Sequence, residues 1–114
     1  MYHEDIKEIA KKNNNFREVL YTGKYSQLVV MSLKPSEEIG EETHEATDQM
    51  IFIVEGDGEA MVDAERFGID EHDVVFIPAG VKHNVTNIGD DDLKLYTIYS
   101  PPEHKPGLVQ EKRT

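Results

Sequence analysis

The chain has 114 residues, 38% of them hydrophobic, and a formal net charge of −11 from 23 acidic and 12 basic side chains. This length accommodates one domain with a core but not two, and we expect residues 1–114 to form a single domain. The acidic balance argues against a nucleic-acid backbone or an anionic membrane surface as partner. The chain has no cysteine, which excludes disulfides and thiolate ligands.

The N-terminal residues, MYHEDIKEIAKK, are charged and lack the apolar segment of a secretory signal. No apolar stretch has the length of a membrane span, so the sequence predicts a cytoplasmic protein. Within residues 3–13, Ile6, Ile9 and Ala10 lie on one stripe. This pattern predicts a short N-terminal helix, which the asparagines at 13–15 end.

After the helix, short segments rich in β-formers alternate with Gly, Pro and Asp turns. The predicted strands occupy residues 16–22, 25–33, 50–56, two parts of 59–70, 73–80, 82–87 and 93–100. Strands at such regular spacing are typical of an all-β sandwich or barrel. We expect the barrel to occupy about residues 25–100. The tail that follows contains three prolines and is expected to extend over the surface.

The strand MIFIV is apolar on both faces. A period of two places Gln49, Ile51 and Ile53 on one face, and the alternate positions 50, 52 and 54 are also apolar. Both faces are therefore expected to be buried. If one face lines a barrel, the other needs a cover, which is either a second sheet or another subunit. We take this as an indication of a homodimer.

Polar residues with the chemistry of metal ligands precede this strand, in the stretch EETHEATDQ at residues 41–49. In extended chain Glu42 and His44 point the same way, and a turn at 45–48 would bring Gln49 towards them. A histidine, His83, follows the turn Pro-Ala-Gly. Carboxylate, neutral imidazole and amide oxygen are all donors that a divalent ion accepts.

Two stretches of the chain resemble the two motifs of the cupins, and the likeness covers roughly residues 36–100. In HDVVFIPAGVKHNVTN, the second motif, His72 stands where glycine is usual, and the other hallmark residues keep the family spacing: Pro78, Gly80, His83 and Asn87. In ETHEATDQMIFIVEG, the first motif, the spacing is intact but two of four hallmark residues are replaced. The resemblance is to small single-domain cupins of the mannose-6-phosphate-isomerase-like kind. It implies an all-β cupin jelly roll, a double-stranded β-helix barrel, with a short N-terminal helix.

The resemblance also implies a metal site. Cupins usually hold a metal with three histidines and one glutamate, and the matching positions here are Glu42, His44, Gln49 and His83. One histidine has become glutamate and the glutamate has become glutamine, so the formal ligand charge stays at −1. One divalent transition metal, Mn, Fe, Ni, Co or Zn, is the implied cofactor. Gln49 is a weaker donor than a carboxylate.

Each residue also has a structural interpretation. Taken alone, His83 is as well explained as a hydrogen-bonded core histidine, Glu42 as solvated charge, and Gln49 as an amide bonded to backbone. The remaining polar residues near the motifs are expected to be structural or exposed: Glu45 and Asp48 solvated, Asn87 tying a turn, and His3, His72 and His104 isolated and exposed.

Three functions remain open. The first is a metalloenzyme, sugar-isomerase-like or oxygenase-like, acting on a small polar organic molecule. A phosphosugar is disfavoured, because residues 36–92 contain 17 acids but only Arg66 and Lys82 as bases, and Lys82 should point away from the cavity. Apart from Tyr96 and Tyr99, no acid–base residues are evident. The alternative is a non-catalytic module that binds metal or a small molecule, and the third is a structural barrel with a degenerate site.

Overall fold

The computed structural model describes residues 1–113. The helix and strands follow the order α1 (Ile6–Lys12), β1 (Arg17–Thr22), β2 (Gln27–Leu33), β3 (Asp48–Glu55), β4 (Gly58–Val62), β5 (Glu65–Ile69), β6 (Val74–Ile77), β7 (His83–Asn87), β8 (Leu93–Ser100) and β9 (Val109–Gln110). The predicted strands are all present. The predicted helix is shorter than residues 3–13, because the carboxylate of Asp5 caps it by accepting a hydrogen bond from the Glu8 amide at 3.1 Å.

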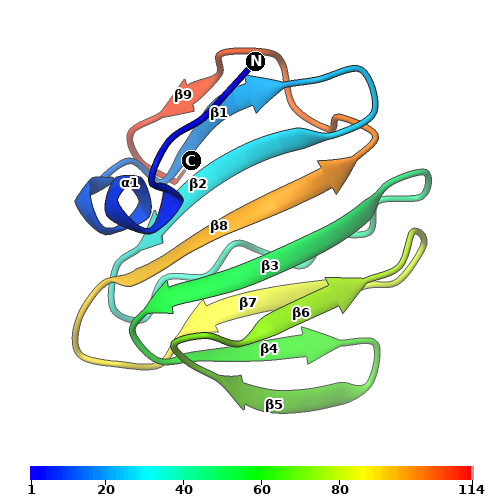
Figure 1. Cartoon of the computed structure of the whole chain (residues 1–114). Coiled ribbons are helices and arrows are strands. Elements are labelled where there is room, and N and C mark those ends of the chain that lie inside the picture. Colours follow the sequence, from blue (N-terminus) through cyan, green and yellow to red (C-terminus); the bar gives the residue numbers. More distant parts are fainter. Residues whose placement is uncertain (114) are drawn as a thin grey trace.

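The strands form two antiparallel sheets (Figure 1). The larger sheet has the order β6-β3-β8-β2-β1-β9, and the smaller has the order β5-β4-β7. Residues 37–42 run beside β7, where Glu38 bridges to Thr86 and Glu42 to His83. The all-β jelly roll predicted from the sequence is confirmed.

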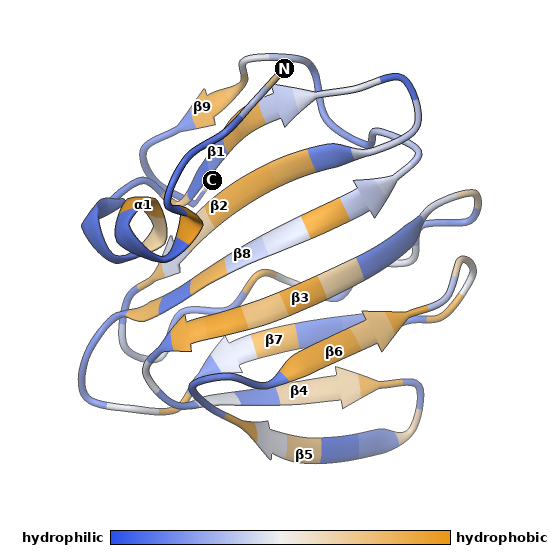
Figure 2. Cartoon of the chain, in the orientation of Figure 1, coloured by the Kyte–Doolittle hydropathy of each residue, from blue (hydrophilic) through white to orange (hydrophobic). Residues whose placement is uncertain are grey.

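One apolar core lies between the sheets. Its largest fully buried hydrophobic side chains are Met31, Leu33, Ile51, Ile77, Leu93, Leu95 and Tyr99. Figure 2 shows hydrophobic residues along β2 and the C-terminal part of β3, whereas α1 and the connecting loops are largely hydrophilic. Within β3 the inward residues Gln49, Ile51 and Ile53 are buried, as the period of two predicts.

The outer face of the large sheet is covered in part by α1. Ala10 of the helix packs with Val30 and Val54, and all three are buried. The cover expected from a second sheet or another subunit is therefore supplied here by the N-terminal helix. Further from the helix, Val74 and Phe76 of β6 stay 55% and 54% exposed. The homodimer stays a prediction, and these two side chains belong to the surface that it would cover.

The C-terminal tail does not simply extend over the surface, as the sequence predicted. Its strand β9 pairs with β1, so Arg17 lies opposite Gln110. Gln27 fixes the tail further upstream, because its side-chain oxygen accepts from the amides of Glu103 and His104 at 3.2 and 2.9 Å. The Gln27 side-chain nitrogen donates to the His104 carbonyl at 2.7 Å. No helix within residues 1–113 combines the length and hydropathy of a membrane span.

Candidate metal centre

Backbone pairing brings Glu42, His44 and His83 to one place. Glu42 and His83 are antiparallel partners that exchange two backbone hydrogen bonds of 2.9 Å. Partners of this kind project their side chains to the same side of a sheet. The His44 carbonyl accepts from the Gly80 amide at 2.8 Å, which holds the chain beside the Pro-Ala-Gly turn that precedes His83.

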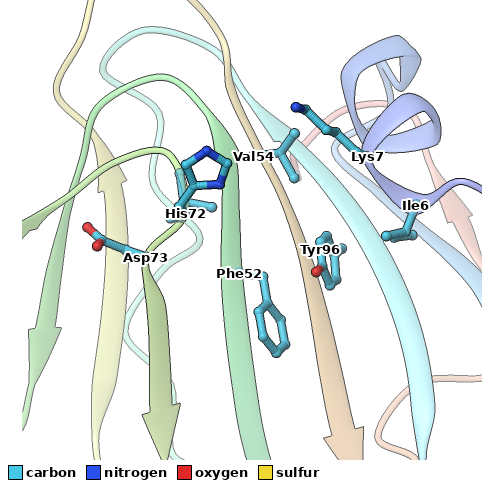
Figure 3. A pocket seen from close by; sticks show the side chains of 8 residues that line it. Ile6, Lys7, Phe52, Val54, His72, Asp73 and Tyr96 are labelled. Carbon is cyan, nitrogen blue, oxygen red and sulfur yellow. The ribbon is translucent and has the colours of Figure 1, made fainter.

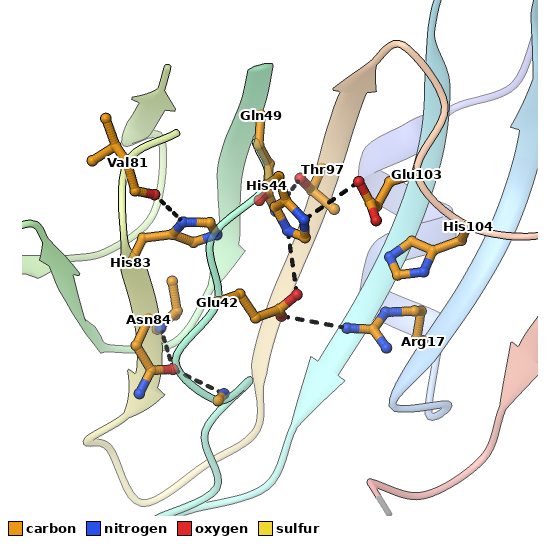
Figure 4. Close-up of polar contacts among 12 residues, drawn as sticks. Arg17, Glu42, His44, Gln49, Val81, His83, Asn84, Thr97, Glu103 and His104 are labelled. Carbon is orange, nitrogen blue, oxygen red and sulfur yellow. Dashed lines mark hydrogen bonds and ion pairs between the residues drawn. The ribbon is translucent and has the colours of Figure 1, made fainter. Parts of the chain in front are cut away.

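Gln49 reaches the same region from the larger sheet. It lies on the inward face of β3, opposite Tyr99 of β8, and is 3% exposed. Figure 4 shows Glu42, His44, Gln49 and His83 turned towards a common interior between the two sheets. The structure thus brings all four residues of the predicted ligand set into one neighbourhood.

Each of the four side chains has one polar atom beside a neighbouring group, through hydrogen bonds for His83 and Gln49 and through longer contacts for the other two. The Nδ1 atom of His83 lies 3.0 Å from the Val81 carbonyl, which requires Nδ1 to carry a proton if the two are hydrogen-bonded. The Gln49 amide nitrogen donates to the Thr97 hydroxyl at 3.0 Å. The remaining contacts are those of His44 Nδ1 with Glu103 Oε1 at 3.4 Å and of Glu42 Oε1 with Arg17 Nη2 at 4.0 Å.

The remaining polar atoms of these side chains face the interior between the two sheets. In the part of the chain that the structure describes, the buried Gln49 oxygen and His44 Nε2 have no hydrogen-bond partner. His44 Nε2 lies 3.2 Å from Glu42 Oε2, and the rings of His44 and His83 are 5.3 Å apart between centroids. Two donors at about 2.1 Å from one ion lie roughly 3 Å from each other, so the His44–Glu42 distance fits a shared cation.

The donors nevertheless do not form a complete site from acids and histidines alone. Within residues 1–113, no group of three or more His, Cys, Asp or Glu side chains has the arrangement of a metal site. The amide oxygen of Gln49 would therefore be required as a donor beside Glu42 and the histidines. An orphaned, buried amide oxygen is compatible with that role, because an acceptor without a partner is costly in a protein interior.

Four further residues border the centre, and they were missed or misjudged from the sequence. Arg17 approaches Glu42, Glu103 approaches His44, and the ring of Tyr99 meets those of His44 and His104 edge to face, at 5.7 and 5.0 Å between centroids. Tyr99 was considered only as a possible acid–base residue. His104 was expected to be exposed, which is wrong because Gln27 holds the tail over the barrel interior.

Burial sets the ionisation of two of these residues. It raises the pKa of Tyr99 well above the ordinary value, so the hydroxyl stays protonated at neutral pH. Burial also lowers the pKa of His104 to about 4, and the nearby Arg17 and His44 act in the same direction. His104 is therefore a neutral imidazole at neutral pH.

The other candidates from the sequence lie outside the centre. Asn87 ties the Gly-Asp-Asp-Asp turn through hydrogen bonds to the Leu33 and Asp91 carbonyls, as predicted. His3, His72 and Glu45 are exposed, and exposed Asp48 accepts from the Ala79 amide. Lys82 points outward and approaches Glu41 at 3.9 Å.

A separate hollow of about 200 Å³ lies on the outer face of the large sheet, beside α1. Figure 3 shows Phe52 and Tyr96 with Ile6 and Lys7 on one side and His72 and Asp73 on the other. The Phe52 and Tyr96 rings are stacked with centroids 4.8 Å apart. None of the four candidate ligands lines this hollow, so it is distinct from the centre.

Comparison with known proteins agrees with this architecture. The family described as "Cupin domain" matches residues 29–99. The chain is 36% identical to BH2720 of Bacillus halodurans, with a TM-score of 0.95 over 96% of this chain and 88% of that structure. It is 38% identical to the uncharacterized protein YrkC of Bacillus subtilis over 96% of this chain, but it spans only 62% of YrkC.

A more distant relative has a more descriptive name. The chain is 29% identical to the polyketide synthase CurC of Streptomyces cyaneus, over 91% of this chain and 72% of CurC. With the matched family covering most of the barrel, and with a jelly roll built from two antiparallel sheets, the chain belongs to the cupin family.

Proposed function

We propose that the chain binds one divalent transition metal through Glu42, His44, Gln49 and His83, and that this centre acts on a small polar organic molecule. The observation that carries the proposal is the orientation of the four side chains. Three of the four have one polar atom close to a supporting neighbour, and all four turn another donor atom towards the same interior. Supporting partners of this kind orient metal ligands in known sites.

The bound metal would serve as a Lewis acid that polarises an oxygen of the substrate. The chain's own residues supply the orientation. Val81 and Glu103 hold the Nδ1 atoms of His83 and His44, which leaves the two Nε2 atoms as donors. Tyr99 stays protonated and is suited to donate a hydrogen bond, whereas the partly exposed Glu103 is the carboxylate best placed to accept a proton.

A small organic substrate is better supported than a phosphosugar of the mannose-6-phosphate-isomerase-like kind. Lys82 points away from the centre and Arg66 pairs with Glu59 on the surface, so the two bases within residues 36–92 do not serve it. Arg17 is a cation that approaches one of the candidate ligands, Glu42, at 4.0 Å. The relative CurC is named a polyketide synthase, which is consistent with a small organic substrate.

The alternative is a non-catalytic module that binds a metal or a small molecule, and one form of it binds a small molecule without metal. The observation that favours it is the position of His44, which lies between the carboxylates of Glu42 and Glu103 at 3.2 and 3.4 Å. If both ring nitrogens of His44 donate hydrogen bonds to these carboxylates, no metal ion is needed between them. The two functions therefore differ in what neutralises Glu42 and Glu103.

Elemental analysis of protein purified without added metal decides between them. We expect about one equivalent of a transition metal per chain, loss of it in His83→Ala, and its retention in the matched control His72→Ala. His72 is an exposed histidine outside the centre. A wild-type protein that stays empty after incubation with Mn²⁺, Fe²⁺, Co²⁺, Ni²⁺ and Zn²⁺ would refute the metal proposal. If the wild-type protein does contain metal, metal-dependent turnover of an organic substrate would separate an enzyme from a metal-binding module.

A further inference from the structure

Four buried side-chain atoms lack a hydrogen-bond partner among the described residues, and they belong to Arg17, His44, Gln49 and His104. Two of them, His44 Nε2 and the Gln49 oxygen, are atoms that would bind the metal in the proposed centre. The other two are Arg17 Nε and His104 Nε2. A guanidinium carries no lone pair for a metal, so a metal cannot explain Arg17 Nε, and His104 is not among the four proposed ligands. Buried polar groups without partners are rare and costly, so the second pair requires its own explanation.

Arg17 is a buried cation with weak compensation. Its side chain is tied at one end, where Nη1 donates to Gln110 Oε1 at 2.7 Å. The closest carboxylate oxygen, Glu42 Oε1, is 4.0 Å from Nη2, which is too long for a hydrogen bond. The residue is only 9% exposed, so water does little to stabilise its charge. The buried Tyr99 hydroxyl also interacts with the Arg17 side chain, but the Nε–H group of Arg17 has no hydrogen-bond partner among the described residues.

His104 is held beside this donor by its own backbone. Both its amide and its carbonyl are bonded to Gln27, and its ring packs edge to face on Tyr99. Figure 4 shows the imidazole next to the Arg17 guanidinium. A neutral imidazole can donate from Nε2 in one of its two tautomers. Two unsatisfied nitrogen donors therefore lie together at the edge of the candidate metal centre.

We propose that Arg17 and His104 form a binding site for the carboxylate of a small organic acid, adjacent to the Glu42–His44 pair. Guanidinium with a neighbouring N–H donor matches the two oxygens of a carboxylate. This inference rests on the proposed function and narrows its substrate class. A 2-hydroxy or 2-oxo acid fits, because its carboxylate would occupy this site while the adjacent oxygen lies towards the metal ligands.

The charge balance of the centre agrees with an anionic ligand. Arg17 contributes one positive charge, and Glu42 and Glu103 contribute two negative charges. A divalent ion brings the total to +1, which a single carboxylate neutralises. Without the metal the total is −1, so the carboxylate should then bind more weakly.

Calorimetric titration with glycolate and with its neutral analogue glycolamide tests the site in protein loaded with Co²⁺. We expect glycolate to bind at least tenfold more tightly than glycolamide in wild type. This preference should disappear in Arg17→Met and persist in the matched control Arg66→Met, whose arginine pairs with Glu59 on the surface. His104→Phe keeps a ring against Tyr99 but removes the donor, and it should weaken glycolate binding several-fold.

The metal content of each variant is measured separately. Full Co²⁺ loading together with unchanged glycolate preference in both Arg17→Met and His104→Phe would overturn the carboxylate site and leave the metal centre standing. If Arg17→Met does not fold, His104→Phe alone decides. If wild type takes up no Co²⁺, the metal proposal fails, and the same titrations in metal-free protein decide the carboxylate site. Glycolate binding lost in the variants then supports it, and no glycolate binding in wild type overturns it.

Discussion

The two ends of the barrel interior differ sharply in how completely their side chains are satisfied. At one end, Leu33, Leu93 and Leu95 are fully buried and surrounded by apolar neighbours. At the other end, the same inward faces carry Gln49, His83 and Tyr99, and the chain adds Arg17 from β1 and His104 from the tail. Within residues 1–113, the four buried side-chain nitrogen and oxygen atoms without partners all belong to residues of this polar end.

This difference is the one expected if the apolar end serves folding and the polar end serves the proposed binding. An unsatisfied buried donor or acceptor costs about 1–3 kcal/mol, and apolar residues of similar size would remove that cost. A fold selected for stability alone would therefore extend the leucine layer through the whole interior. Stability is given up at the polar end, and such local departures from good packing are typical of functional sites.

A substitution in the apolar end should have the largest effect on stability and none on metal binding. Leu95→Ala removes a fully buried side chain from the core. We expect the free energy of unfolding to fall by about 2–5 kcal/mol, because the lost contacts and the cavity both contribute. Urea denaturation measures this change. A large drop in metal affinity in the folded Leu95→Ala protein would contradict the division between the two ends.

At the polar end, removing the charge of Glu103 should have the opposite effects, with a small change in stability and a large loss of metal affinity. Glu103→Gln weakens the contact that holds His44 Nδ1, and the side chain itself is one-third exposed, so little stability is lost. We expect metal affinity to fall by about 10–100-fold, the usual effect of removing a partner that orients a ligand. Competition with a chromophoric chelator measures the affinity. Glu111→Gln, in the same tail but away from His44, is the control and should bind metal like wild type.

The depressed pKa of His104 predicts a pH effect confined to the polar end. Above pH ~6.5 the imidazole is neutral in both the folded and the unfolded chain, and it has no effect on stability. As the pH falls from there to about 4, the folded pKa, the unfolded chain takes up the proton first and stability is lost. We expect a loss of about 1–2 kcal/mol, less than the full shift implies because the ring is partly exposed.

Unfolding curves of metal-free protein at pH 7 and pH 4.5 measure this loss. His104→Phe removes the titrating group and should reduce the pH dependence by the same amount, whereas His72→Phe, at an exposed histidine, should leave it unchanged. An equal pH dependence in wild type and His104→Phe would show that burial of His104 does not influence its protonation.

The sequence predicted the apolar end better than the polar end, and the reason is the range of the interactions. Alternation along β3 and β8 depends on neighbours in the chain, so the strands and their inward residues could be recognised directly. The candidate ligands Glu42, His44, Gln49 and His83 were found because the family spacing relates positions that are far apart in the sequence. Periodicity alone would have connected only Glu42 with His44.

The residues around the ligands had no comparable signal. Arg17 begins an ordinary amphipathic strand, and its position depends on pairing of β1 with β9, which lies more than 90 residues further along the chain. Glu103 and His104 follow two prolines in a segment that resembles an exposed tail. Gln27 binds them to the barrel through side-chain hydrogen bonds to their backbone, which no hydrophobic pattern reveals.

Gln49→Glu should have a smaller effect, but it tests both properties at one position, because it should raise metal affinity and lower the stability of the metal-free protein. A carboxylate is a stronger donor than an amide oxygen, so we expect metal affinity to rise by roughly tenfold. Without metal, the same change places a third carboxylate beside Glu42 and Glu103 and loses the hydrogen bond that the Gln49 amide donates to Thr97. The metal-free variant should therefore unfold at a lower denaturant concentration than wild type, and the metal-bound variant should recover. If metal stabilises Gln49→Glu no more than it stabilises wild type, position 49 does not contact the ion. The unpartnered amide oxygen of Gln49 would then bind a different ligand.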